Sequence, residues 1–133
     1  MNLSKSLMVL AFLCLWTRPV YASEDVACKT QKANGKRVVY SCVLPVKAKE
    51  QPLHFKAFFS GSHDDTELSI YLTLNALPVK CDKGSKTWLN GVDGDVSLDC
   101  LFKVSGTAGT KKTLNVTVDY YHAQLTAVKL SAP

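Results

Sequence analysis

Apolar and polar residues alternate along most of the chain, and a period of two predicts β-strands with one buried face. The pattern is strongest between residues 67 and 104. The strands predicted for residues 67–74 and 95–104 each have an unbroken row of apolar side chains on one face. These rows are Leu68, Ile70, Leu72 and Leu74 in the first strand, and Val96, Leu98, Cys100, Phe102 and Val104 in the second.

Further strands are predicted for residues 38–44, 53–60 and 113–121, and a weaker one for 123–130. The Asn34-Gly35 pair before the first of these predicts a hairpin with a type I′ turn, in which both central residues have positive φ. Residues 38–44 are apolar on both faces, which favours a strand covered on two sides. No segment shows the helical period of 3.6.

Seven or eight short antiparallel strands predict an all-β domain. We expect a small, disulfide-stabilised antiparallel β-sandwich of the immunoglobulin-like kind, in which two sheets bury each other's apolar faces. A small β-barrel is the alternative.

The N-terminus has the features of a secretory signal peptide. Lys5 precedes an apolar run from Leu7 to Trp16, and a small residue, Ala22, ends the segment. The apolar run is about half the ~20 residues needed to span a bilayer. We therefore expect residues 1–22 to be removed, residues 23–133 to form one domain, and no integral membrane segment to remain after cleavage.

Cleavage would leave four of the five cysteines. Four cysteines in a short exported chain indicate two disulfides and an oxidising compartment, which predicts a periplasmic or secreted protein. The hairpin at Asn34-Gly35 favours a Cys28–Cys42 bond, and the central strands favour a Cys81–Cys100 bond.

Two polar clusters were considered as metal or catalytic sites. Asp93 and Asp95, with Asn90, begin like a calcium-binding loop, but Leu98 stands where such a loop needs a sharp-turn glycine. His63 is followed by two aspartates, yet adjacent loop residues rarely converge on one atom. We expect no metal, no cofactor and no enzymatic activity.

The charge of the expected mature chain is mild, with 14 basic and 11 acidic residues. Arg37 is its single arginine, and arginine is the side chain best suited to bidentate contacts with phosphates and bases. Scattered lysines are typical of a solvated surface, so we expect no nucleic acid partner.

Aromatic side chains are the best indication of function. Four aromatic side chains are expected to be exposed, because of the alternation along their strands or because they lie in loops. Exposed Tyr and Trp side chains are enriched at contact surfaces. We expect a small protein-binding module (an inhibitor, chaperone, immunity or adhesion factor) whose partner is another extracytoplasmic protein. A carbohydrate or other small-ligand binding domain is the alternative, and a secreted toxin or effector is a weaker one. The candidate binding residues are Phe58, Tyr71, Trp88 and Tyr121.

Overall fold

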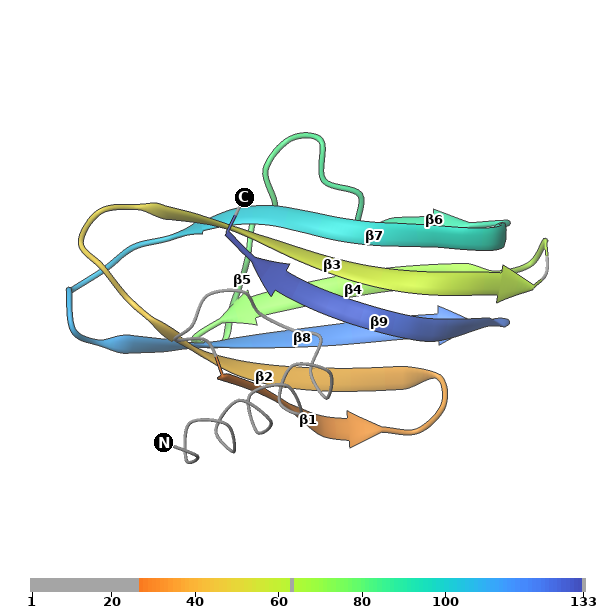
Figure 1. Cartoon of the computed structure of the whole chain (residues 1–133), viewed down its shortest axis with the longest axis horizontal. Coiled ribbons are helices and arrows are strands. Elements are labelled where there is room, and N and C mark those ends of the chain that lie inside the picture. The colour runs from red at the N-terminus through yellow and green to blue at the C-terminus, as the bar shows by residue number, and fades with distance from the viewer. Residues whose placement is uncertain (1–26, 63, 133) are drawn as a thin grey trace, which may run out of the picture.

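The computed structural model describes residues 27–62 and 64–132, and every regular element in them is a β-strand (Figure 1). No helix in this part of the chain could cross a membrane. The predicted signal peptide lies outside these residues. The nine strands are β1 (Ala27–Ala33), β2 (Arg37–Pro45), β3 (Gln51–Ser62), β4 (Glu67–Leu74), β5 (Leu77–Pro78), β6 (Trp88–Asn90), β7 (Asp93–Val104), β8 (Lys111–Tyr121) and β9 (Ala123–Ser131).

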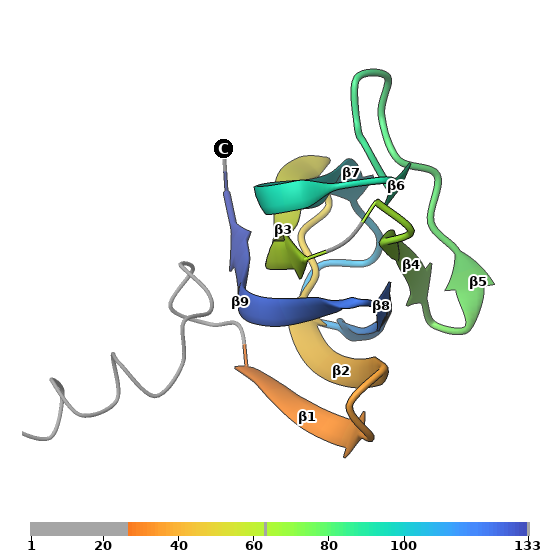
Figure 2. The ribbon, with the colours of Figure 1, turned by 90° about the vertical axis from the view of Figure 1, so that its right-hand side faces the viewer.

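The strands form two antiparallel sheets, which confirms the predicted sandwich. Sheet A has the order β1-β2-β8-β4-β5, with β6 also paired to β4, and sheet B has the order β7-β3-β9. Figure 2 shows the two layers with the strands nearly end-on, and β5 lies on the side of the molecule away from β1 and β9.

The strand order within the sandwich differs from that of a constant-type immunoglobulin domain. If the two short strands are left aside, sheet A holds the first, second, fourth and sixth strands of the chain, and sheet B the third, fifth and seventh. The immunoglobulin order places the fifth strand beside the second and the sixth beside the third. The likeness to that fold is therefore one of architecture.

The core lies between the sheets and consists of the apolar rows that alternation predicts. All residues of the row in β7 from Leu98 to Val104 are at most 3% exposed, and Leu68, Ile70 and Leu72 of β4 are at most 5% exposed. The row in β8 (Leu114, Val116 and Val118) is fully buried against them. Burial of a side chain of this size stabilises the fold by about 1.5–3 kcal/mol.

β2 was expected to be covered on both faces, but the structure covers only one of them. Cys42 and Leu44 are buried, but Val43 on the opposite face is 40% exposed. The strand is central within sheet A, between β1 and β8. Its second apolar face belongs to the outer surface of the sandwich.

The turn between β1 and β2 is a hairpin, as expected, but the predicted type I′ geometry is wrong. Gly35 has a φ of 88°, whereas Asn34 does not have positive φ. Instead, the Asn34 side chain closes the turn, because its Oδ1 accepts hydrogen bonds from the backbone N–H groups of Lys36 (3.0 Å) and Arg37 (2.9 Å). Asparagine can replace a backbone turn in this way without a left-handed conformation.

The two disulfides are those predicted, Cys28–Cys42 and Cys81–Cys100. The first joins residues that lie directly opposite each other on β1 and β2. The second joins the start of a long connection to the middle of β7. Each closes a short segment, with sequence separations of 14 and 19 residues.

The connection from Val79 to Thr87, called here the strap, covers the outer edges of both sheets. Its Asp82 N–H donates to Leu101 O (2.6 Å), and Lys86 O accepts from Asp99 N–H (2.8 Å), so it follows the edge of β7. It then returns to sheet A, where Thr87 O accepts from Ile70 N–H (3.0 Å) and β6 pairs with β4. The strap therefore places β6 beside β4.

Candidate functional site

The outer surface of sheet A carries a group of exposed aromatic side chains, called here the aromatic face and consisting of Tyr71, Trp88 and Tyr121. Their exposed fractions are 55%, 52% and 45%. Alternation on β4 turns Tyr71 outward, because its neighbours Ile70 and Leu72 point into the core. Trp88 lies on the same face, because it pairs directly with Ser69.

Tyr71 and Trp88 are diagonal neighbours across β4 and β6. Ser69, the partner of Trp88, precedes Tyr71 by two residues on β4, so the two aromatic residues are one diagonal step apart. Diagonal side chains on a sheet are about 7–8 Å apart, within reach of aromatic rings. A single flat ligand could therefore contact both rings.

Polar groups separate the aromatic side chains. Ser69 lies between Trp88 on β6 and Asp119 on β8. In the next row, Glu67 lies between Asn90 on β6 and Tyr121 on β8. The face therefore combines rings with carboxylate, amide and hydroxyl groups.

The row through Ser69 ends in an ion pair. Arg37 of β2 is opposite Asp119 of β8, with its Nε 2.5 Å from Asp119 Oδ1 and its Nη2 3.1 Å from Oδ2. The hydrogen bond and the charge of Asp119 raise the pKa of Arg37 above its usual value. The bidentate geometry holds the guanidinium plane in a fixed orientation on the face.

Tyr121 is held by residues of the neighbouring loop. Its ring stacks on the imidazole of His122, with centroids 4.1 Å apart and an angle of 23° between the planes. His122 Nδ1 lies 2.7 Å from Asp65 Oδ1, and its carbonyl accepts a hydrogen bond from buried Thr66. The loop before β4 therefore fixes the ring at the edge of the aromatic face. The sequence gives no sign of the pairing of Asp65 with His122, because 57 residues separate the two positions.

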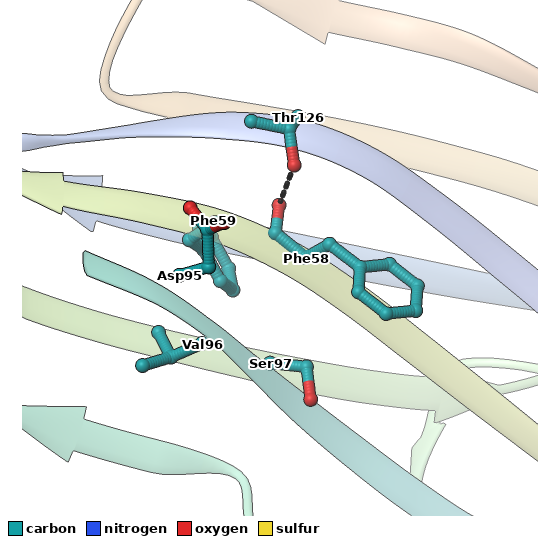
Figure 3. A pocket seen from close by; sticks show the side chains of 6 residues that line it. All are labelled: Phe58, Phe59, Asp95, Val96, Ser97 and Thr126. Carbon is teal, nitrogen blue, oxygen red and sulfur yellow. Dashed lines mark hydrogen bonds between the residues drawn. The ribbon is translucent and has the colours of Figure 1, made fainter.

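Phe58 does not join the other three candidates, because it lies on the outer surface of sheet B. It is half-buried at the side of an open depression of about 490 Å³, shown in Figure 3. Asp95, Ser97 and Thr126 also line the depression, and Thr126 Oγ1 donates to Phe58 O (3.1 Å). Lys56 Nζ lies 5.8 Å from the centre of the Phe58 ring.

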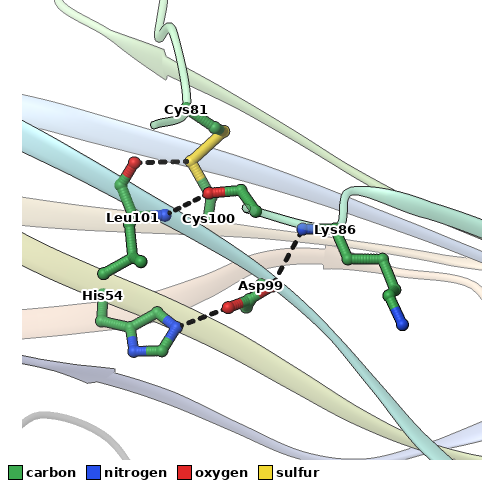
Figure 4. Close-up of a disulfide and its surroundings, with 7 residues drawn as sticks. His54, Cys81, Lys86, Asp99, Cys100 and Leu101 are labelled. Atoms are coloured by element: carbon green, nitrogen blue, oxygen red, sulfur yellow. Dashed lines mark hydrogen bonds and ion pairs between the residues drawn. A yellow bond between two sulfur atoms is a disulfide. The ribbon is translucent and has the colours of Figure 1, made fainter. Parts of the chain in front are cut away.

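Sheet B also carries a histidine–aspartate pair that sequence analysis did not reveal (Figure 4). His54 of β3 lies 2.7 Å from Asp99 of β7, and each side chain is 22% exposed. The separation of 45 residues hid the pair, although a cross-strand pairing of residues 53–60 with 95–104 would have indicated it.

The polar clusters considered from sequence are placed as follows. Asp93 and Asp95 belong to β7 in sheet B, and Asn90 belongs to β6 in sheet A. Within residues 27–62 and 64–132, no group of three or more His, Cys, Asp and Glu side chains could hold a metal ion. His63 lies outside the described residues.

Comparison with known proteins assigns no family. No family model matches the chain, and no curated protein matches its sequence. Among solved structures, it is similar to a family 35 carbohydrate-binding module from an environmental isolate, with a TM-score of 0.43, 9% identity, and 76% of this chain and 71% of that one covered. It is also similar to the C-terminal domain of EclA, a sugar-binding protein (TM-score 0.42, 12% identity, 82% and 79% covered). TM-scores this low assign neither a family nor a ligand.

Proposed function

We propose that this protein is a non-enzymatic binding module that recognises carbohydrate through the aromatic face. The observation that carries the proposal is the diagonal placement of Tyr71 and Trp88, both more than half exposed, on one sheet. Aromatic rings have a large apolar surface and few rotatable bonds, so they form contacts at low entropic cost. The C–H groups on one side of a sugar ring can stack on such a surface.

The groups between the rings support the same ligand class. A sugar has hydroxyl groups around an apolar ring, and it needs hydrogen-bonding partners at its edge. Glu67, Ser69 and Asn90 of β4 and β6 provide an acceptor, a hydroxyl and an amide beside the rings. A ligand site with an apolar surface and a few fixed polar groups is typical of small-molecule recognition.

A protein partner is the second candidate, and the residue types of the face favour it. Tyr, Trp and Arg dominate the energetics of protein interfaces, and Arg37 ends the row that begins at Trp88. However, interface hot spots are usually enclosed by residues that exclude water. The carboxylates of Glu67 and Asp119 divide this face, so we favour the carbohydrate.

The disulfides support a proposal for the compartment. Two disulfides are consistent with an oxidising environment, and we propose that the module acts in the periplasm or outside the cell.

A glycan array followed by calorimetry tests the proposal. For the best glycan, we expect Trp88→Ala and Tyr71→Ala each to weaken binding at least about tenfold, which is ~1.4 kcal/mol. Phe58→Ala is the matched control, because it removes an aromatic ring from the opposite sheet, and it should leave the affinity unchanged. The second candidate would be favoured if no glycan bound and a protein from envelope extract were captured by the wild type but not by Trp88→Ala.

A further inference from the structure

Lysines from several parts of the sequence gather at one end of the sandwich. One end, called here the basic end, is formed by the β2–β3 and β7–β8 connections and the adjoining strand ends. Among the described residues of this end, the charged ones are Lys47, Lys49, Lys103, Lys111 and Lys112, with Glu50 as the one acid. The opposite end is mixed in charge, because it has both acids and the basic residues of the β1–β2 turn: Asp64, Asp65, Glu67, Asp93 and Asp95, with Lys36 and Arg37.

Strand pairing brings the lysines together from distant parts of the sequence. Lys111 is the β-sheet partner of Pro45, and Lys103 is the partner of Pro52. The two connections are joined by backbone hydrogen bonds from Val46 N–H to Thr110 O (3.0 Å) and from Gly106 N–H to Lys47 O (3.3 Å). The cluster is therefore part of the fixed framework of the fold.

Four of these lysines are fully available to a partner. Lys47, Lys49, Lys103 and Lys111 are exposed. Lys112 is half-buried, and its Nζ donates to Ser105 O (2.8 Å), so it has a structural role as well.

An exposed leucine lies near the same end. Leu77 is 69% exposed, more than any other large apolar side chain in the described residues. It follows a tight turn at Asn75 and Ala76, which both have positive φ (49° and 68°). Asn75 is hydrogen-bonded in both directions to Thr113, the neighbour of Lys112. Leu77 therefore lies at the level of Leu114 in the strand register, three residues along β8 from Lys111.

We propose that the basic end docks on an anionic membrane surface, with the lysines near the lipid headgroups and Leu77 inserted between them. Clusters of four or more basic residues bind anionic lipid surfaces, and an apolar side chain at the same place adds to the attraction. This inference goes beyond the proposed recognition of carbohydrate and does not depend on it.

Two features favour lipid over an acidic polysaccharide. All the cations of the basic end are lysines, which act as point charges and do not make the bidentate contacts of arginine. The exposed large apolar residue at this end is Leu77, whereas Tyr71, Trp88 and Tyr121 lie along the outer face of sheet A. A leucine suits an acyl boundary and gives a sugar ring no aromatic surface.

The test measures sedimentation of the exported, disulfide-bonded protein with lipid vesicles. One preparation contains about one quarter phosphatidylglycerol in phosphatidylcholine, and the other contains phosphatidylcholine alone. We expect binding to the anionic vesicles at about 0.1 M salt and its loss at about 0.5 M, because salt screens charges beyond a short distance.

Two variants, each with three Lys→Glu changes and therefore the same net charge, test whether the basic end is the docking surface. Changing Lys47, Lys49 and Lys111 to Glu should weaken binding at least about 100-fold, since each lysine near an anionic surface contributes about fivefold. The control changes Lys29, Lys32 and Lys36, exposed lysines of β1 and the β1–β2 turn, to Glu and should retain most of the binding. Leu77→Ser should weaken binding about tenfold.

Three results would overturn the proposal: no binding to the anionic vesicles, equal losses in the two triple variants, or binding to soluble polygalacturonate but not to vesicles. Unchanged binding of Leu77→Ser would overturn the insertion of that residue. Glycan binding by the aromatic face would be unaffected by any of these results.

Discussion

His54 Nε2 donates to Asp99 Oδ2 across 2.7 Å, and this contact joins β3 to β7 on the outer surface of sheet B. The other carboxylate oxygen, Oδ1, accepts the backbone N–H of Lys86 from the strap (2.9 Å). Partial burial alone would raise the pKa of Asp99. The hydrogen bonds from His54 and Lys86, together with the nearby charges of His54 and Lys56, outweigh burial and hold it below its usual value of 3.8.

The lowered pKa of Asp99 predicts a loss of stability in acid. A carboxyl whose pKa is lower in the folded state stabilises the fold above its unfolded-state pKa, and the contribution disappears as the pH falls through the folded-state pKa. We expect Asp99→Asn to be less stable than the wild type at pH 7, and the difference to vanish well below pH 3.8. Urea unfolding across this range measures it. Asp95→Asn, an exposed acid on the same strand, is the control, and a difference that grows in acid would contradict the assignment.

Trp88 should contribute little to stability. Because half of its surface is exposed, we expect Trp88→Ala to change the free energy of unfolding by less than about 1 kcal/mol. Leu98→Ala, which removes a fully buried side chain from β7, should cost about 2–5 kcal/mol. Urea denaturation compares the two. A large loss for Trp88→Ala would show that the ring is packed and unsuited to a ligand.

The Cys81–Cys100 disulfide should affect both stability and binding. Replacing both residues by Ala should cost about 3 kcal/mol in the chain-entropy model. It should also weaken glycan binding, because the strap, which contains Cys81, holds β6 and Trp88 against β4. The Cys28–Cys42 pair is the control: its removal should cost a similar amount of stability and leave the affinity of the folded protein unchanged. Equal losses of affinity would contradict a positioning role for the strap.

Ala76 offers a test of backbone strain. Its φ of 68° lies in the left-handed region, which costs a residue with a side chain about 1–2 kcal/mol. Ala76→Gly removes this cost and adds flexibility to the unfolded chain, so we expect a net stabilisation of about 0.5 kcal/mol. Ala48→Gly, at an exposed loop position without positive φ, should instead destabilise. Differential scanning calorimetry distinguishes the two signs.

Alternation predicted the strands and their buried faces because burial depends on local order along a strand. The outward direction of Tyr71 follows in the same way from Ile70 and Leu72. Alternation does not reveal which strands are neighbours, so the pairing of β6 with β4 was missed. β6, which carries Trp88, is not among the predicted strands, because a three-residue strand between polar residues has too short a pattern to detect.

Because alternation does not reveal which strands are neighbours, it also does not predict which surface residues lie together. Five of the lysines scattered along the sequence lie together at one end of the sandwich, because Lys111 pairs with Pro45 and Lys103 with Pro52. His54 and Asp99 likewise meet only across a strand pairing. Residues brought together by non-local pairing leave no spacing in the sequence by which to recognise them.

The strand order has a consequence for the rate of folding. From β2 to β4 the chain passes from sheet A to sheet B and back. β2 and β4 both pair with β8, which comes much later in the sequence. β3 likewise pairs only with the later strands β7 and β9. Domains dominated by such distant pairings fold in milliseconds to seconds. The β1–β2 hairpin needs no later strand, and its Cys28–Cys42 bond can form as soon as its two arms are in an oxidising environment. We therefore expect oxidation of this hairpin to precede assembly of the sandwich, which leaves the folding chain cross-linked while its sheets are still open.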